Sequence, residues 1–139
     1  MAVFLNNKVG LKINNVDLSD HVTSITLNQA FDELEVTAMG DLSHKFVKGL
    51  ESATLTVSFL NDQAAGEVLA TLSAAYGTTV AFKAINDSGS AVSATNELYS
   101  GDILVNNLTP INGATGDMAT MDITFTVNSA VTVADSGTW

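Results

Sequence analysis

Residues 17–27 read Asp17-Leu18-Ser19-Asp20-His21-Val22-Thr23-Ser24-Ile25-Thr26-Leu27, and residues 49–59 read Gly49-Leu50-Glu51-Ser52-Ala53-Thr54-Leu55-Thr56-Val57-Ser58-Phe59. Apolar and polar residues alternate in both stretches, which predicts two strands with one buried face each. Roughly twenty acidic and polar residues connect them, and compact domains rarely keep so long a connection without using it. We therefore expect residues 30–49 to form an arm that projects from the domain and contacts another subunit.

The remaining pattern predicts a mostly β fold. Residues 121–127 alternate between apolar and polar side chains, and the many threonines and valines suit half-exposed strands. Residues 80–85 and 91–95 are expected to pair as a hairpin around the turn at 86–90. The other expected strands are residues 9–13, 23–27, 53–59 and 99–105.

A single helix is predicted over residues 62–76, because apolar residues recur there at i, i+3, i+4 and i+7. Asn61 or Asp62 is expected to cap its beginning, and Gly77 to take the left-handed conformation that commonly follows a helix. The apolar stripe of this helix is Ala65, Val68, Leu69, Leu72 and Tyr76. The side chains expected to face inward beneath it are Leu55, Val57, Phe59, Ile123 and Phe125.

Length and charge narrow the possible functions. A chain of 139 residues is expected to form one domain, 1–139, with a loose C-terminal tail, 134–139. The sequence contains 15 acidic residues, 5 lysines and no arginine, for a formal net charge of −10. Arginine dominates phosphate and base recognition, so this composition argues against a nucleic-acid-binding surface.

Other sequence signals concern location. Residues 1–8 lack a basic region and have too short an apolar run for a signal peptide. No segment approaches the roughly 18 apolar residues of a membrane-spanning helix. Cysteine is absent, which excludes disulfides and thiolate metal sites. We expect a protein that is made and assembled in the cytoplasm, without a membrane partner.

Two groups of polar residues resemble chemical sites. Asp17, Asp20 and His21 are of metal-ligating types, but their spacing matches no ligand motif, so a polar turn with an aspartate cap is favoured. Asp32, Glu33 and Glu35 are close enough in sequence to suggest paired carboxylates. A solvated charge cluster is the better interpretation, because such runs are common.

Two further features carry no catalytic signal. His44 lies in the arm without an acid or nucleophile nearby in sequence, so a surface contact is favoured. The glycines at 113 and 116 belong to neither phosphate-binding glycine motif, and no helix is predicted after them. We therefore expect no enzyme, no cofactor and no metal ion.

Several short segments occur in an order, spacing and chain length that match one family. They are residues 17–25, Gly40-Asp41, Phe46, Gly49-Leu50, residues 61–66, 93–96, 99–101, 108–113 and 116–120. Together they resemble the major tail tube proteins of long-tailed, non-contractile bacteriophages and related prophages. The segments cover most of the chain.

The resemblance implies a β-sandwich or small open barrel with one flanking helix. In that family six copies form a ring, one sheet of each copy joins a continuous inner barrel, and the rings stack into a tube. The arm reaches the neighbouring ring, and DNA passes through the lumen during ejection without specific binding. The implied location is the virion tail, assembled in the bacterial host cytoplasm. The implied partners are other copies and further tail proteins such as the tail tip, tape measure and tail terminator.

The resemblance also assigns roles to residues. The expected lumen residues are Asp102 and Asp122, from polar strand faces. Phe31 and Phe46 are the expected anchors of the arm, because buried aromatic side chains dominate contact energies. The expected inter-subunit arm residues are Phe31, Asp32, Glu33, Glu35, Asp41, His44, Lys45, Phe46 and Lys48.

Two alternatives share the same pattern. One is a β-sandwich binding or adhesion module, although the candidate rings for a glycan platform, Tyr76, Tyr99 and Trp139, do not cluster in sequence. The other is a ring-forming tube protein of a contractile tail or a secretion system. Electron microscopy of the purified protein separates rings and tubes from monomers.

Overall fold

The computed structural model describes residues 7–139 and consists of an eight-stranded antiparallel sheet, one α-helix and one 3-10 turn. Residues 1–6, which carry most of the segment assessed above for a signal peptide, lie outside the described part of the chain. The helix α1 spans Val68–Ala75 and the turn η1 spans Ser19–His21. The strands are β1 (Gly10–Ile13), β2 (Val16–Asp17), β3 (Val22–Glu35), β4 (Phe46–Leu60), β5 (Thr79–Ile85), β6 (Leu98–Leu104), β7 (Thr120–Val127) and β8 (Thr132–Ala134).

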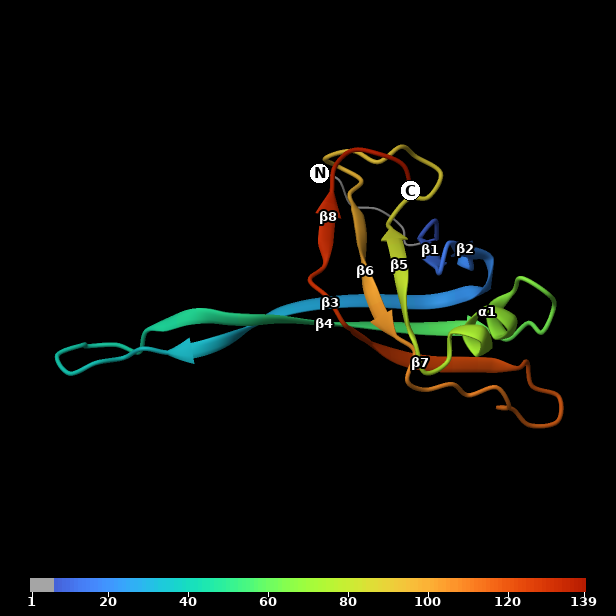
Figure 1. Cartoon of the computed structure of the whole chain (residues 1–139), viewed down its shortest axis with the longest axis horizontal. Coiled ribbons are helices and arrows are strands. Elements are labelled where there is room, and N and C mark those ends of the chain that lie inside the picture. The colour runs from blue at the N-terminus through green and yellow to red at the C-terminus, as the bar shows by residue number, and fades with distance from the viewer. Residues whose placement is uncertain (1–6) are drawn as a thin grey trace.

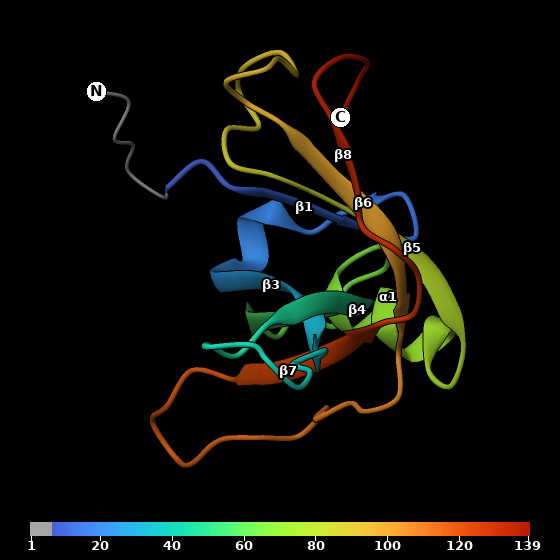
Figure 2. The same cartoon turned by 90° about the vertical axis from the view of Figure 1, so that its left-hand side faces the viewer.

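The sheet is bent into two halves. Its strand order is β2-β1-β5-β6-β7-β4-β3, and β8 pairs with β6. β6 and β7 are joined by only two residue pairs, Ile103 with Val127 and Leu104 with Thr126. Beyond this short joint the strands β5, β6 and β8 run across the direction of β3, β4 and β7 (Figures 1 and 2). The predicted mostly β fold is confirmed, and the sheet stays open.

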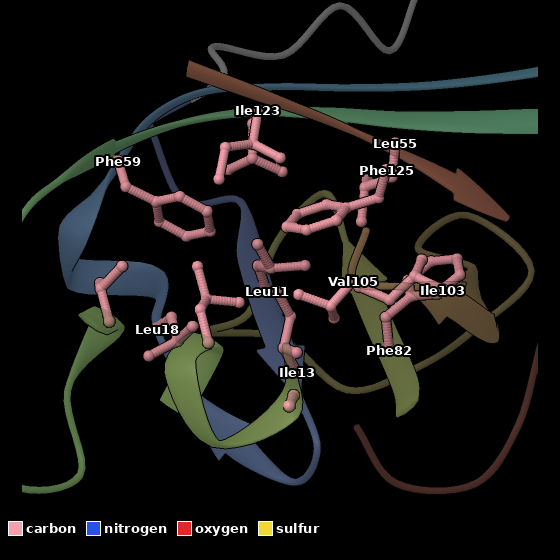
Figure 3. Packing of buried hydrophobic residues seen from close by; sticks show 14 of the residues in the cluster. Leu11, Ile13, Leu18, Leu55, Phe59, Phe82, Ile103, Val105, Ile123 and Phe125 are labelled. Atoms are coloured by element: carbon pink, nitrogen blue, oxygen red, sulfur yellow. The ribbon is translucent and has the colours of Figure 1, made fainter. Parts of the chain in front are cut away.

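The core fills the space between the two halves. Alternate residues of β4 and β7 point inward, and the register places Leu55 opposite Phe125 and Val57 opposite Ile123. Leu11, Phe82 and Ile103 approach them from the other half of the sheet (Figure 3). Three buried residues of α1, Val68, Leu69 and Leu72, belong to the same cluster. The five side chains expected beneath the helix are all buried, so this prediction is confirmed.

The helix is shorter than its apolar stripe suggests. α1 begins at Val68 instead of residue 62, and Asp62 does not cap it. The Asp62 carboxylate accepts a hydrogen bond from the Ala64 amide (2.8 Å), which closes a turn ahead of the helix. Gly77 follows the helix with φ +80°, as expected, whereas Tyr76 is 57% exposed and lies outside the core. In the described residues no helix is long and apolar enough to cross a membrane.

The expected hairpin between residues 80–85 and 91–95 is wrong. β5 pairs with β6 instead, and the connection between them is a loop organised by the buried Asn96. The Asn96 amide nitrogen donates to the carbonyls of Asp87 (2.9 Å) and Ala91 (3.2 Å). The Asn96 oxygen accepts from the Asp87 amide (3.2 Å). One side chain therefore satisfies the backbone groups that a strand ladder would have paired.

The C-terminal segment, expected to be loose, returns to β1. The Trp139 ring packs so closely over Gly10 that a Cβ atom there would lie 2.5 Å from it. The Lys12 Nζ lies 4.4 Å from the centroid of the same ring, a cation–π distance. Glycine at position 10 is what allows the indole to approach the strand.

Phe59 tests the assignment of the strand faces. Phe59→Ala should lower the free energy of unfolding by about 3–5 kcal/mol, because a fully buried ring is replaced by a cavity. Urea denaturation measures this, with Phe31→Ala as the matched control, since Phe31 is 50% exposed on the arm. A loss below about 1 kcal/mol for Phe59→Ala would mean that the strand faces are assigned backwards.

Candidate functional site

The arm is a two-stranded β-ribbon. β3 and β4 pair from the body of the domain to the far end of the ribbon, where Glu35 lies opposite Phe46, with register shifts only between Val22 and Ser24 and between Phe31 and Glu33. Figure 1 shows this ribbon extending well beyond the other strands. The strands therefore continue past the boundaries predicted from alternation, and residues 30–49, called the arm below, form most of a hairpin instead of an irregular connection.

The arm is also more apolar on its surface than its acidic sequence suggests. Seven of the twelve exposed large hydrophobic side chains among the described residues lie on it, and Leu50 follows directly. Their exposed fractions run from 48% to 104%. The seven are Phe31, Leu34, Val36, Met39, Leu42, Phe46 and Val47. Contiguous exposed apolar surface of this kind marks an interaction site.

The register distributes these side chains over both faces of the ribbon. Successive residues of a strand point to opposite faces, and directly paired residues share a face. Leu34 pairs with Val47, which places both on one face. Phe46 pairs with Glu35 and therefore lies on the opposite face. Phe31 shares the face of Phe46, and the Lys48 Nζ lies 4.8 Å from the Phe31 ring centroid.

A β-bulge marks the base of the arm. Gly49 and Leu50 together oppose Asp32, between the pairs Phe31–Glu51 and Glu33–Lys48. A Cβ atom at Gly49 would lie 3.0 Å from the Asp32 Cβ and 3.3 Å from the Leu34 side chain. Glycine therefore fits the close approach of the two strands, and the bulge strengthens their twist where the arm leaves the body.

A polar network fixes the loop at the tip. The Ala38 amide donates to the Asp41 carboxylate (2.8 Å), which also binds the Lys45 Nζ (2.7 Å). The Lys45 amide in turn donates to the Thr37 hydroxyl (2.9 Å). The bond from Lys45, followed by that from Ala38, lowers the pKa of Asp41, so the carboxylate stays ionised. Met39 projects from this ordered loop with its side chain fully exposed.

Two of the four carboxylates of the arm, Glu35 and Asp41, have ionisable partners within the arm. Glu35 accepts hydrogen bonds from His44 and, at 2.9 Å, from the Thr37 hydroxyl, and both lower the pKa of Glu35, with His44 having the larger effect. Glu33 lies opposite Lys48. His44 thus has a partner that the sequence analysis did not identify. The arm contributes four carboxylates and two lysines, so its formal charge is −2 of the total −10.

A second surface feature is the outward face of β3, β4 and β7. Over residues 24–28, 54–58 and 122–126 every outward side chain is a hydroxyl, an amide or a carboxylate, and the Thr56 and Thr124 hydroxyls lie 3.2 Å apart. Ala30 and Leu60 border this stretch on the same face. Asp122 is the one charged residue, opposite Ser58. This polar face consists of Ser24, Thr26, Asn28, Thr54, Thr56, Ser58, Asp122, Thr124 and Thr126. Asp102, the other expected lumen residue, lies on β6 in the other half of the sheet.

The metal ligands considered from the sequence do not come together as a set. Asp17 accepts a hydrogen bond from the Ser19 amide (3.0 Å), as an aspartate that caps a turn does. His21 instead contacts three carboxylates: its Nδ1 lies 2.8 Å from Asp20 and 3.4 Å from Glu67, and its Nε2 lies 3.0 Å from Asp62. The ligand atoms of Asp20, His21 and Glu67 could hold a metal ion. A protonated imidazole satisfies the same contacts without one.

These contacts join η1 to the segment ahead of α1. Burial by itself would lower the pKa of His21, but the hydrogen bonds to Asp20 and Asp62 and the charge of Glu67 outweigh it and raise the pKa above the usual 6.5. The Ala64 amide, followed by His21, lowers the pKa of Asp62. Both changes favour the charged pair, which stabilises the join between the two segments.

The sequence analysis did not identify the exposed aliphatic residues of the arm as candidate contact residues. The sequence analysis selected the charged and aromatic residues of the arm and omitted Leu34, Val36, Met39, Leu42 and Val47. The pairing of Leu34 with Val47 could have been predicted from the sequence. A hairpin that turns at Gly40-Asp41, midway between these two residues, places them opposite each other. Of the three carboxylates considered from the sequence, Asp32 lies on the opposite face of the ribbon from Glu33 and Glu35, so the three do not come together.

Comparisons with known proteins add information about the fold. No family model and no curated protein matches the sequence. A solved chain described as "Virion of native gene transfer agent (GTA) particle" matches with a TM-score of 0.76 and 11% sequence identity. The match covers 95% of this chain and 99% of that chain. At this identity the likeness shows that the two chains share one architecture over nearly their whole length.

His21 predicts a pH dependence of stability. Because its folded pKa is raised, its contribution is complete below about 6.5, the unfolded value, and is lost as pH rises through the folded pKa. The free energy of unfolding should therefore fall over this range in the wild type and fall less in His21→Gln. Urea denaturation at several pH values measures both, and parallel profiles for the two proteins would refute the role of His21.

Proposed function

We propose that this chain is a structural subunit of a phage tail tube, which forms stacked hexameric rings with a lumen that conducts DNA during ejection. The observation that carries the proposal is the arm, a ribbon of ordered structure whose large apolar side chains are half to fully exposed in the subunit. Exposed apolar surface on this scale requires a partner. The family resemblance and the shared architecture with a virion chain support the choice of other copies as that partner.

An arm that binds elsewhere on a second copy makes a heterologous contact. Such contacts propagate into rings when the rotation closes and into filaments when it does not. A stacked tube combines both kinds of assembly. The tip network also supports this role, because an ordered loop loses less conformational entropy on binding than a flexible one.

The polar face supports the conduit role. It carries eight neutral polar side chains and the single carboxylate of Asp122, and none of its residues is a cation. DNA binding depends on lysine and arginine contacts to phosphates, so such a surface lets DNA pass without adhering. We propose this face, with Asp122, as the lumen lining, and we assign Asp102 to it only if β6 also reaches the lumen.

The remaining expectations follow from the same role. The subunit would reside in the virion tail after assembly in the bacterial host cytoplasm. Tail tip, tape measure and tail terminator proteins would bind the ends or the lumen of the tube. A structural role needs neither catalysis nor a cofactor.

Phe46 tests the arm. Phe46→Ser should raise the subunit concentration needed for half-maximal assembly about tenfold or more, because it removes a central aromatic anchor. Tyr76→Ser is the matched control, since Tyr76 is an aromatic of similar exposure outside the arm, 57% against 54%. Sedimentation and negative-stain electron microscopy report the assembly. Equal effects of the two substitutions would argue against an arm-specific contact.

Asp122 tests the polar face. The wild-type assembly should show no DNA binding in a gel-shift assay at physiological salt, because the face offers no cation to phosphate. Asp122→Lys should introduce salt-sensitive binding, and Asp135→Lys, the same charge change outside this face, should introduce less. Micromolar, salt-sensitive binding by the wild type would contradict the conduit role.

A further inference from the structure

Both faces of the arm carry large apolar side chains that are about half exposed. Phe31 and Phe46, on the first face, are 50% and 54% exposed. Leu34 and Val47, on the second face, are 52% and 49% exposed. The cross-strand pair Leu34–Val47 thus lies on the opposite side from the two aromatic residues. Glu33, Glu35 and Lys48 share the aromatic face, and turning either face to solvent leaves large apolar side chains exposed.

This pattern differs from that of a hairpin that lies over one neighbour. In a ribbon with one buried face, each strand alternates between apolar and polar residues. β7 shows this alternation in the body of the subunit. Strands that are covered on both sides carry apolar residues on both sides. On the basis of the function proposed above, we infer that each arm is held between two other copies of the chain, one against each face.

The charge distribution identifies other copies as suitable occupants. The arm carries a formal charge of −2, whereas the rest of the chain carries −8, so contact through the arm brings together less like charge than contact between bodies. Two of the four arm carboxylates that would enter the interface already have partners, since Asp41 binds Lys45 at 2.7 Å and Glu35 accepts a hydrogen bond from His44. No unpaired charge of these pairs needs to lose its hydration alone.

The size of the ribbon also fits two contacts. A standard interface uses about 20–30 residues and about 800 Å² from each partner. The arm supplies 20 residues in all, divided between two faces and the tip, so a neighbour against one face would leave about half of them uncovered, and each of two neighbours would bury about half a standard side. An arm inserted at the interface between two adjacent subunits of the next ring would bind both of them. Each ring would then stabilise the subunit interfaces of the neighbouring ring.

Crosslinking with a dilute labelled subunit separates one neighbour from two. The chain has no cysteine, so Asp32→Cys and Glu33→Cys place a benzophenone maleimide on the second and first faces respectively, without removing an apolar anchor. Each labelled protein is assembled with a large excess of unlabelled wild type and irradiated. Either single variant should give crosslinked dimers, and the double variant should give trimers. Dimers as the largest product of the double variant would overturn the inference.

Matched substitutions give an independent test. Val47→Ser, on the second face, should raise the concentration for half-maximal assembly at least about tenfold, as Phe46→Ser does on the first. If Phe46→Ser impairs assembly and Val47→Ser does not, the two-sided contact is wrong while the proposed function stands. If neither substitution affects assembly and no label crosslinks, the proposed function fails as well.

Discussion

The structure depends on the long ladder between β3 and β4, which runs from the core into the arm. Within the body this ladder supplies one wall of the core, through alternate residues such as Leu55 and Val57. Beyond the body the same ladder continues as the arm. The backbone hydrogen bonds run through both parts, and the bulge shifts the pairing by one residue between them, so the body register and the bulge together set which side chains lie on each face of the arm. The only irregularity near this transition is the bulge at Gly49 and Leu50, which permits two residues to oppose one.

The core could be predicted from the sequence because its physical signal is local. Alternation in residues 53–59 and 121–127 identified the buried side chains, and spacing identified the buried side of the helix. The beginning of the helix was predicted wrongly, because the pattern could not show that Asp62 bonds to Ala64 in a separate turn. The hairpin at 91–95 was predicted wrongly because the hydrogen bonds of Asn96 join residues that no periodicity relates.

The candidate site shows a different limit of sequence analysis. A projecting arm was predicted from the length of one connection, but its surface was judged from its acidic residues. Those acids lie beside Lys48, His44 and Lys45, and the aliphatic residues between them are the exposed ones. The pairing of charges depends on which residues face each other across the hairpin. The fold of the hairpin therefore has to be known before the arm can be described as apolar.

The short joint between β6 and β7 has a consequence for the shape of any assembly. Two residue pairs are too few to fix the angle between the halves of the sheet, so the side chains packed between them must hold it. A substitution that changes the side-chain volume at Ile103 or Phe125 would then change the angle between the two halves of the sheet. In the proposed ring, this angle would set the curvature. The diameter of the lumen would then depend on the hydrophobic core as well as on the contacts between subunits.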